Sequence, residues 1–209
     1  MTDYEVLRNA MKSGKVPEVT RLVNEFLEAG EPAGDILNQG LLLAMNEVGK
    51  RFKANEVFVP EVLIAARAMK AGTQVLKPHL IEAGVEAVGT AVMGTVKGDL
   101  HDIGKNLVIM MLEGAGFKVI DAGVDVSPEE FVALAKEHNA HIVGLSALLT
   151  TTMPGMKSAV DVMRSEGVTA KIIIGGAPVT QDYADKIGAD GYSEDAAAAA
   201  DLALSLIGS

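Results

Sequence analysis

The stretch that decides the fold is Gly94-Thr95-Val96-Lys97-Gly98-Asp99-Leu100-His101-Asp102-Ile103-Gly104-Lys105. It follows a short apolar run at residues 87–93 and precedes a stretch with helical spacing at residues 103–114. A strand, a loop of small and polar residues and a helix, in this order, are typical of an open parallel α/β sheet. Ligands of such sheets bind beyond the carboxyl ends of the strands. The loop is therefore a candidate binding site.

The same alternation of apolar runs and helical stretches continues to the end of the chain. Two segments, Ser127-Pro128-Glu129-Glu130 and Ser193-Glu194-Asp195, have the capping side chain and early acidic residues of helix starts. Repeated strand–helix units predict a parallel sheet covered on both faces, here a Rossmann-like, flavodoxin-like α/β domain of five strands. The expected further strands are 117–120, 141–145, 171–174 and a weak 190–192, and the expected helices are 103–114, 128–138, 153–166, 179–186 and 194–207.

Residues 1 to about 80 show helical periodicity only, with apolar side chains every three or four residues. Glycine and proline interrupt the pattern at Ser13-Gly14, at Gly30-Glu31-Pro32 and around Asn55 and Pro60. This pattern predicts a bundle of four antiparallel helices. The expected domains are a helical domain at 1–86 and an α/β domain at 87–209.

The composition excludes several classes of protein. Apolar residues make up 49% of the chain and charged residues 22%, as in ordinary globular proteins. No apolar run approaches the roughly 18 residues of a membrane span, and no secretory signal opens the chain, so we expect a cytoplasmic protein without a membrane partner. The absence of cysteine excludes disulfides and thiolate metal sites. The net charge of −10 argues against nucleic acid as the main partner.

The loop does not match known nucleotide-binding motifs. No G-x-G-x-x-G follows the first expected strand. The segment from Gly98 to Gly104-Lys105 resembles a phosphate-binding loop, but five residues separate its glycines, and Asn106 stands where a magnesium-binding Ser or Thr is required. The sequence therefore disfavours nucleoside triphosphate binding.

Asp99 and His101 are the residues of the loop that suggest metal chemistry. A carboxylate two residues from a histidine can accept a hydrogen bond from one ring nitrogen, which leaves the other nitrogen for a metal. One protein ligand is too few for a bare zinc ion, but it suffices for a metal already held by a macrocycle. From the residues alone, a loop histidine hydrogen-bonded to its neighbour is the commoner explanation, and both remain open.

A resemblance to a known family favours the metal. Asp99-x-His101-x-x-Gly104 resembles the D-x-H-x-x-G signature of cobalamin-binding domains. Ser146-x-Leu148 after the third strand resembles the family's S-x-L, and Gly175-Gly176 after the fourth strand resembles its paired glycines. Nearly the whole chain is similar to the corrinoid proteins of methyltransferase systems, which place a four-helix domain before a cobalamin domain. It is also similar to the cobalamin-binding module of methionine synthase.

The resemblance implies a cofactor and a site. Cobalamin would bind with its dimethylbenzimidazole base displaced from the cobalt and with His101 as the metal ligand. Asp99 matches the carboxylate behind this histidine, and Thr152 stands where methionine synthase has a serine that completes the hydrogen-bonded set. These three residues form the implied catalytic set. The residues implied to contact the cofactor are Gly98, Asp99, His101, Asp102, Ile103, Gly104, Ser146, Leu148, Thr150, Gly175, Gly176, Phe52 and Val59.

Phe52 and Val59 belong to the helical domain, which resembles the family's cap over the methyl face of the corrin. For Val59, a place in the core of the helix bundle is an equal alternative. The implied function is that of a methyl carrier, cycling between cob(I)alamin and methylcobalamin, which is not catalytic by itself. Its implied partners are a substrate:corrinoid methyltransferase, a methylcorrinoid:acceptor methyltransferase and a reductive activase. The methyl donor would be methanol, a methylamine, a betaine or a methoxylated aromatic compound.

Other functions share parts of this pattern. The small subunit of a cobalamin-dependent mutase carries D-x-H-x-x-G but usually lacks the helical cap. A light-sensing cobalamin regulator has a similar helical domain, but this chain lacks tryptophan and shows no basic recognition helix. A receiver-like phosphorylation domain would need an acidic pair at the end of the first strand, which is not apparent.

Overall fold

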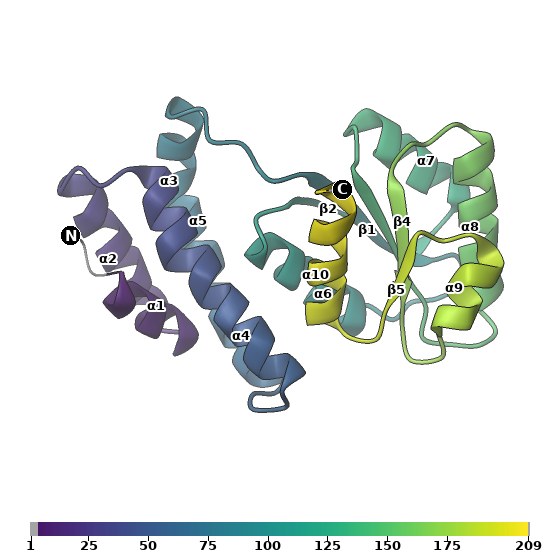
Figure 1. Ribbon diagram of the computed structural model, residues 1–209, viewed down its shortest axis with the longest axis horizontal. Coiled ribbons are helices and arrows are strands. Elements are labelled where there is room, and N and C mark those ends of the chain that lie inside the picture. Colours follow the sequence, from purple (N-terminus) through teal and green to yellow (C-terminus); the bar gives the residue numbers. More distant parts are fainter. Residues whose placement is uncertain (1–3, 209) are drawn as a thin grey trace. The chain divides into compact units, whose positions relative to one another are not determined.

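The computed structural model describes residues 4–208, and the chain divides into two compact units at Ala87 and Val88 (Figure 1). The first unit is helical, and the second is built on a sheet. Within residues 4–208, no helix is both long enough and apolar enough to cross a bilayer.

The first unit consists of four helical segments in its described part, as the sequence predicts. Pro60, expected near a break, lies instead in the first turn of the last helix, where proline needs no hydrogen-bonded N–H. The chain leaves helical conformation just before it, at Ala54 to Phe58. The segments are α1 (Glu5–Lys12), α2 (Val16–Glu28), the continuous run of α3 (Ala33–Asp35), the π-helix η1 (Ile36–Leu42) and α4 (Leu43–Lys53), and finally α5 (Val59–Glu82).

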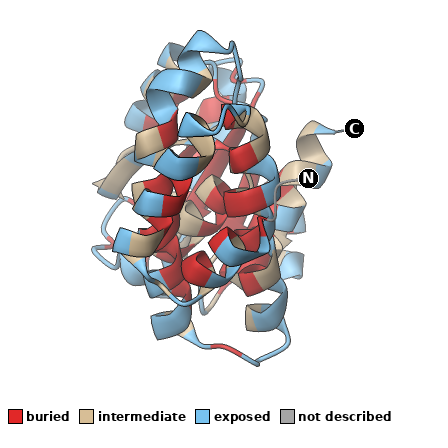
Figure 2. Ribbon diagram, turned by 90° about the vertical axis from the view of Figure 1, so that its left-hand side faces the viewer, coloured by how far each residue is buried: buried red, intermediate tan, exposed pale blue. Residues whose placement is uncertain are grey.

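Helix α5 is the centre of this unit and packs against α1, α2 and α4. Each helix has a buried stripe and an exposed stripe (Figure 2), as expected for amphipathic helices around one core. A Cβ atom on Gly72 of α5 would lie 3.0 Å from side-chain atoms of Val19 and Leu41. The lack of a side chain at this position therefore allows α5 to approach α2 and η1 closely.

The second unit is a parallel sheet with the order β2-β1-β3-β4-β5. This order confirms the predicted flavodoxin-like fold, whose direction of winding reverses between β1 and β3. Helices α6 and α10 lie on one face of the sheet, and α7, α8 and α9 lie on the other (Figure 1). The strands are β1 (Thr90–Val96), β2 (Lys118–Val126), β3 (Ile142–Ser146), β4 (Lys171–Gly175) and β5 (Gly191–Ser193), and the helices are α6 (Ile103–Gly114), α7 (Pro128–Glu137), α8 (Met153–Ser165), α9 (Gln181–Ile187) and α10 (Ala196–Ile207).

The predicted helix starts are present. The Ser127 hydroxyl accepts the N–H of Glu130 at the start of α7. At the start of α10 the cap is Asp195, whose carboxylate accepts the N–H of Ala198 at 2.7 Å. Carboxylates and hydroxyls at these positions bind amide groups that the helix itself leaves without acceptors.

All five strands end later than the sequence predicts, and β1 and β2 do so by three or more residues. β1 includes Gly94, Thr95 and Val96, which were expected in the loop, and β2 continues six residues beyond Ile120 to Val126. The polar Thr95 is fully buried, because β1 lies inside the sheet. β2 is an edge strand, so it tolerates Asp121, Gly123 and Asp125, which do not look like strand residues in the sequence.

Candidate functional site

The candidate site lies at the carboxyl ends of β1 and β3. These strands are neighbours, and Thr95 of β1 is in register with Ser146 of β3. The loop that follows β1 therefore meets the loop that follows β3, as the predicted strand order requires. The two loops, residues 97–102 and 147–152, carry half of the predicted site residues, including Asp99, His101 and Thr152.

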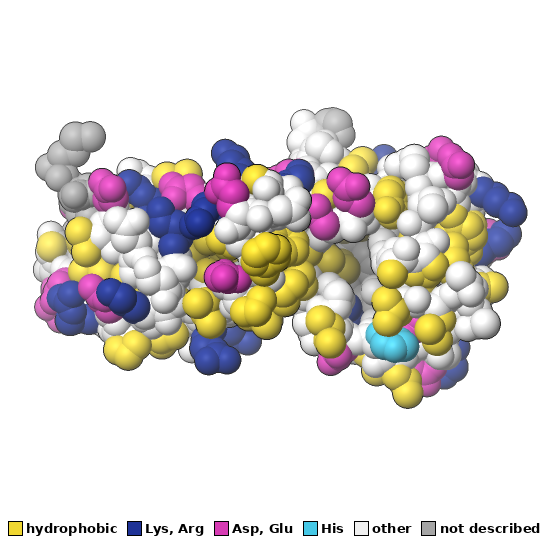
Figure 3. Space-filling view, turned by 90° about the horizontal axis from the view of Figure 1, so that it is seen from below, with side chains coloured by type: hydrophobic (Ala, Val, Ile, Leu, Met, Phe, Trp, Pro, Cys, Tyr) yellow, Lys and Arg dark blue, Asp and Glu magenta, His cyan; other side chains and the backbone are white. Residues whose placement is uncertain are grey.

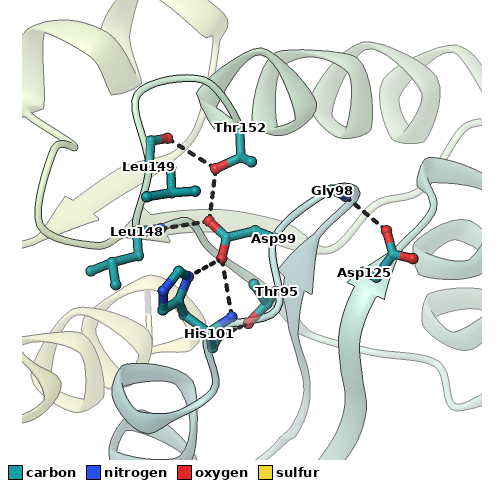
Figure 4. A network of polar contacts seen from close by, with 8 residues as sticks. All are labelled: Thr95, Gly98, Asp99, His101, Asp125, Leu148, Leu149 and Thr152. Atoms are coloured by element: carbon teal, nitrogen blue, oxygen red, sulfur yellow. Dashed lines mark hydrogen bonds and ion pairs between the residues drawn. The ribbon is translucent and has the colours of Figure 1, made fainter.

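The carboxylate of Asp99 joins the two loops (Figure 4). Its Oδ1 atom accepts hydrogen bonds from the backbone N–H of His101 at 3.1 Å and from His101 Nδ1 at 2.7 Å. Its Oδ2 atom accepts from the N–H of Leu148 at 2.8 Å and from the Thr152 hydroxyl at 2.7 Å. Asp99 is fully buried, so these four bonds replace the water that the carboxylate loses on folding.

Asp99 remains ionised in this environment. Burial by itself would raise the pKa of its carboxyl group, because it disfavours the charged form. The hydrogen bonds from Thr152, Leu148 and His101 outweigh burial and hold the pKa of Asp99 well below its usual range. An ionised carboxylate accepts only, so the proton in its bond with His101 lies on Nδ1.

His101 thereby has a fixed tautomer and a free nitrogen. With Nδ1 donating to Asp99, the Nε2 atom of the neutral ring carries a lone pair. The side chain is about half exposed (51%), although the carboxylate behind it is fully buried. The backbone is held as well, because the buried Thr95 hydroxyl donates to the His101 carbonyl at 2.8 Å. This arrangement can present a single, oriented nitrogen to a metal.

Thr152 contributes a hydroxyl just before α8. Its Oγ1 atom lies 2.7 Å from Asp99 Oδ2 and 2.9 Å from the carbonyl oxygen of Leu149. A hydroxyl has one proton for two acceptors, and the charged carboxylate is the stronger one. The structure thus brings Asp99, His101 and Thr152 into one hydrogen-bonded set.

The surface around His101 is unusually apolar for a loop region. Figure 3 shows apolar side chains exposed on one face of this unit. Four large apolar residues of the two loops and of the start of α6 are 43–76% exposed. They are Leu100, Ile103, Leu148 and Leu149. Exposed apolar groups of this kind mark surfaces that bind a partner or a ligand.

The predicted glycines fall into two kinds. A Cβ atom on Gly176 would overlap the backbone oxygen of Ala147, and one on Gly175 would lie 3.1 Å from the Ser193 carbonyl oxygen, so both permit close packing inside the unit. At Gly104, in the first turn of α6, a Cβ atom would meet nothing within 4 Å. Packing within the chain does not require a glycine at that position, which leaves room there for an external group.

The other predicted residues make fewer contacts. Gly98 turns the loop at φ +84°, and its N–H donates to Asp125 at 2.8 Å. The exposed Asp102 precedes α6 and accepts a bond from Asn106 at 3.2 Å. Thr150 is exposed in the second loop. In the helical unit, half-buried Phe52 lies in the last turn of α4 and half-buried Val59 begins α5.

Sequence reasoning missed Thr95 and Asp125. Thr95 was expected in the loop, and Asp125 falls in a segment where no strand was expected. The N–H of Gly98 and the ammonium of Lys97 both hold the pKa of the Asp125 carboxyl below its usual range. For Thr95 the sequence offered one signal, a polar residue directly after an apolar run. For Asp125 it offered none, because only the pairing of β2 with β1 brings this residue to the loop.

Comparisons with known proteins agree with this geometry. A family model described as a B12-binding domain matches residues 89–201, and a second B12-binding domain model matches residues 4–77. The chain is 45% identical over 205 residues to dimethylamine corrinoid protein 2 of Methanosarcina acetivorans, with 96% of this chain and 94% of the relative covered.

Solved structures give the same result. One match is the methanol:cobalamin methyltransferase complex of Methanosarcina barkeri, with a TM-score of 0.89, 30% identity and coverage of 98% of this chain and 79% of that one. Another is a cobalamin-binding protein of Desulfitobacterium hafniense DCB-2, with a TM-score of 0.79, 33% identity and 98% of both chains covered.

The fold, the strand-end histidine and the two domain matches define a two-domain B12-binding protein. Within that class, the chain belongs to the family of corrinoid proteins of methyltransferase systems. This confirms the resemblance inferred from Asp99-x-His101-x-x-Gly104 and its companion motifs.

Proposed function

We propose that this protein carries a methyl group on the cobalt of a bound cobalamin between two methyltransferases, with His101 Nε2 as the protein's ligand to the metal. The observation that carries the proposal is the hydrogen bond between His101 Nδ1 and the buried Asp99 carboxylate at 2.7 Å. It fixes the tautomer of a half-exposed side chain and leaves its Nε2 atom with a lone pair. One such nitrogen suits a metal that arrives within a macrocycle.

The residues at the strand ends fit a large, flat, mostly apolar group. Leu100, Ile103, Leu148 and Leu149 offer apolar contact around His101, and Gly104 leaves space beside them. Gly175, Gly176 and Ser146 would line the path of the displaced nucleotide tail, since they are small residues at the ends of β3 and β4. Gly98, Asp102 and Thr150 complete the proposed rim, and Phe52 and Val59 of the helical unit are proposed to shield the methyl face.

The bound corrinoid supplies a cobalt ion that accepts and donates the methyl group. The chain's own residues orient His101 and control its proton. When Nε2 is free of the metal it can take up a proton, and the ionised Asp99 stabilises the resulting imidazolium. The Thr152 hydroxyl and the Leu148 N–H donate to the other oxygen of this carboxylate, Asp99 Oδ2, and keep it in place. Apolar side chains around the site limit the access of water to the reacting centre.

We propose a methylamine as the methyl donor. The supporting observation is the 45% identity to a dimethylamine corrinoid protein over almost the whole chain, against 30% to the chain from the methanol complex. The partners would be a methylamine:corrinoid methyltransferase, a second methyltransferase that uses the methylated protein, and a reductive activase, all in the cytoplasm. The relative solved in a methanol:cobalamin methyltransferase complex supports a partner of the first kind.

The first experiment tests ligation by His101. After reconstitution of 15N-labelled protein with unlabelled cobalamin, the electron paramagnetic resonance spectrum of the cobalt(II) form should show splitting by one axial 15N, which distinguishes a histidine of the protein from the 14N base of the cofactor. The splitting should be lost in His101→Ala, because that variant lacks the ligand, and retained in His138→Ala, a substitution at the C-terminal end of α7, before the first residue of β3. An unchanged spectrum in His101→Ala would show that His101 is not the ligand.

The second experiment tests the donor. The reconstituted, reduced protein is mixed with a dimethylamine-, monomethylamine- or methanol-specific methyltransferase and the matching substrate, and methylation is followed by the absorption spectrum of the corrinoid. We expect methylation with an amine system. Methylation by the methanol system alone would reject the methylamine assignment and keep the carrier function.

A further inference from the structure

The edge strand β2 loses its regular geometry where it passes the loop that carries Asp99. Its pairing with β1 shifts register between Met93 and Gly94 and again between Gly94 and Val96. In the same segment Gly123 has φ +87° and Asp125 has φ +56°. Aspartate is one of the few side chains that enter the left-handed region at modest cost. Strained residues of this kind persist where surrounding contacts hold them.

Asp125 makes three contacts with three successive residues of the loop. Its Oδ1 atom accepts the N–H of Gly98 at 2.8 Å (Figure 4). Its Oδ2 atom lies 3.2 Å from the ammonium of Lys97. Its own N–H donates to the carbonyl oxygen of Asp99 at 3.0 Å. One residue of β2 thus holds the loop through both its side chain and its main chain.

The position of this loop decides whether the Asp99 carboxylate can reach its donors. These donors lie on two loops, at His101 on one side and at Leu148 and Thr152 on the other. Hydrogen bonds of 2.7–2.8 Å weaken steeply when distance or angle changes. A small displacement of the Asp99 main chain would therefore loosen both halves of the arrangement.

We propose that Asp125 is a positioning residue that holds the loop of residues 97–99 so that the Asp99 carboxylate stays between His101 and the loop after β3. The inference rests on the proposed role of His101 as the metal ligand. Asp125 contacts none of the groups that donate to this carboxylate, and it reaches the loop through the Lys97 ammonium and the main chain of Gly98 and Asp99.

Two substitutions separate the carboxylate of Asp125 from its backbone conformation. Asp125→Gly accepts the left-handed φ without strain but has no acceptor for the Gly98 N–H. Asp125→Asn tolerates the same φ and keeps an oxygen acceptor. Asn139→Gly is the matched control, because Asn139 also has a positive φ (+48°) but lies in the loop between α7 and β3.

Amide hydrogen exchange of the full chain without corrinoid is the first measurement. In Asp125→Gly, the Leu148 and His101 amides should exchange about five- to tenfold faster. The loss of one hydrogen bond lowers the free energy of local opening by an amount that corresponds to this factor. Asp125→Asn and Asn139→Gly should leave both amides unchanged. The Leu148 amide is decisive, because Leu148 lies on the other loop and reports only on the Asp99 carboxylate.

Three results would overturn the proposal. The Leu148 amide could stay protected in Asp125→Gly while the Gly98 amide exchanges faster, which would limit Asp125 to its own loop. Asn139→Gly could give the same acceleration, which would show a general loss of stability. Asp125→Asn could behave like Asp125→Gly, which would show that the hydrogen-bond acceptor is not what matters.

A second readout uses the protein with cobalamin bound. With 15N-labelled protein and unlabelled cobalamin, Asp125→Gly should reduce the fraction of cobalt(II) centres with axial 15N splitting, and Asp125→Asn should restore that fraction. An unchanged fraction in Asp125→Gly contradicts the positioning role. If the unaltered chain shows no nitrogen splitting, the proposed function is wrong, whereas the amide exchange of the corrinoid-free chain still decides the role of Asp125.

Discussion

The Asp99 carboxylate is fully buried and remains ionised through four hydrogen bonds. The bonds come from two loops, so one side chain both orients His101 and connects the ends of β1 and β3. Hydrogen bonds to a charged acceptor contribute more to stability than neutral ones, and leaving such a group without donors is costly. At this residue, the stability of the loops and the orientation of His101 depend on the same hydrogen bonds.

The pH dependence of stability should reveal this carboxylate. Its pKa is lower in the folded than in the unfolded protein, so the unfolded state binds the proton first, and the contribution of Asp99 is lost as the pH falls below about 4. Asp99→Asn should lower the free energy of unfolding by about 2 kcal/mol at pH 7. This difference should shrink below about pH 4.

Urea unfolding of both chains at a series of pH values measures the difference. Asp182→Asn on the exposed side of α9 is the control and should show little change at any pH. A penalty for Asp99→Asn that is constant down to pH 3 would contradict the depressed pKa.

At the scale of elements, the site depends on the close approach of the carboxyl ends of β3 and β4. Ser146 of β3 is in register with Gly175 of β4, and the Ala147 N–H donates to the Gly175 carbonyl oxygen at 3.3 Å. Gly176 follows with φ +132°, and its Cα lies against the backbone of Ala147. The loop that carries Leu148 therefore rests directly on the end of β4.

Gly176→Ala should displace this loop. The added Cβ would overlap the Ala147 carbonyl oxygen, which is backbone and cannot move without its strand, so we expect a loss of about 2–4 kcal/mol in unfolding free energy. Gly167→Ala is the matched control, because Gly167 also has a positive φ (+71°) but a Cβ there would meet nothing within 4 Å. Calorimetry of both variants measures the difference, and equal losses would show that backbone strain, not the overlap, is responsible.

At the scale of the whole molecule, the site just described is built within one compact unit. Asp99, His101, Leu148, Thr152 and Asp125 all lie in residues 88–209, and the core around the sheet is formed by residues of the same unit. Of the 28 acidic and 18 basic residues, 16 and 8 fall in this unit, so it carries most of the net charge of −10. A unit with its own core can fold alone.

A fragment of residues 88–209 should therefore unfold in one cooperative transition and keep the Asp99 arrangement. The measurement is amide exchange, in which Leu148 should be protected to a similar degree in the fragment and in the full chain. Loss of protection at Leu148 in a fragment whose sheet amides stay protected would show that the site needs the helical unit. A fragment without any protected amides would show that the sheet itself needs it.

The alternation of strands and helices and the helical first unit could be predicted from the residues themselves, and the cofactor class from the resemblance that Asp99-x-His101-x-x-Gly104 and its companion motifs show. These properties are encoded locally, in the spacing of apolar residues, in capping residues such as Ser127, and in the short motif Asp99-x-His101-x-x-Gly104. Thr152 was found only through the resemblance, since 53 residues separate it from Asp99.

Features that depend on neighbours in space could be seen only in the folded chain. The sheet order places β1 inside, so that polar Thr95 becomes part of a strand, and it places β2 at the edge, where Asp121 and Asp125 are tolerated. Asp125 reaches the Asp99 loop only because β2 pairs with β1. Hydrogen bonds between residues far apart in the chain follow from the packing of the sheet, and no local pattern of residue types encodes them.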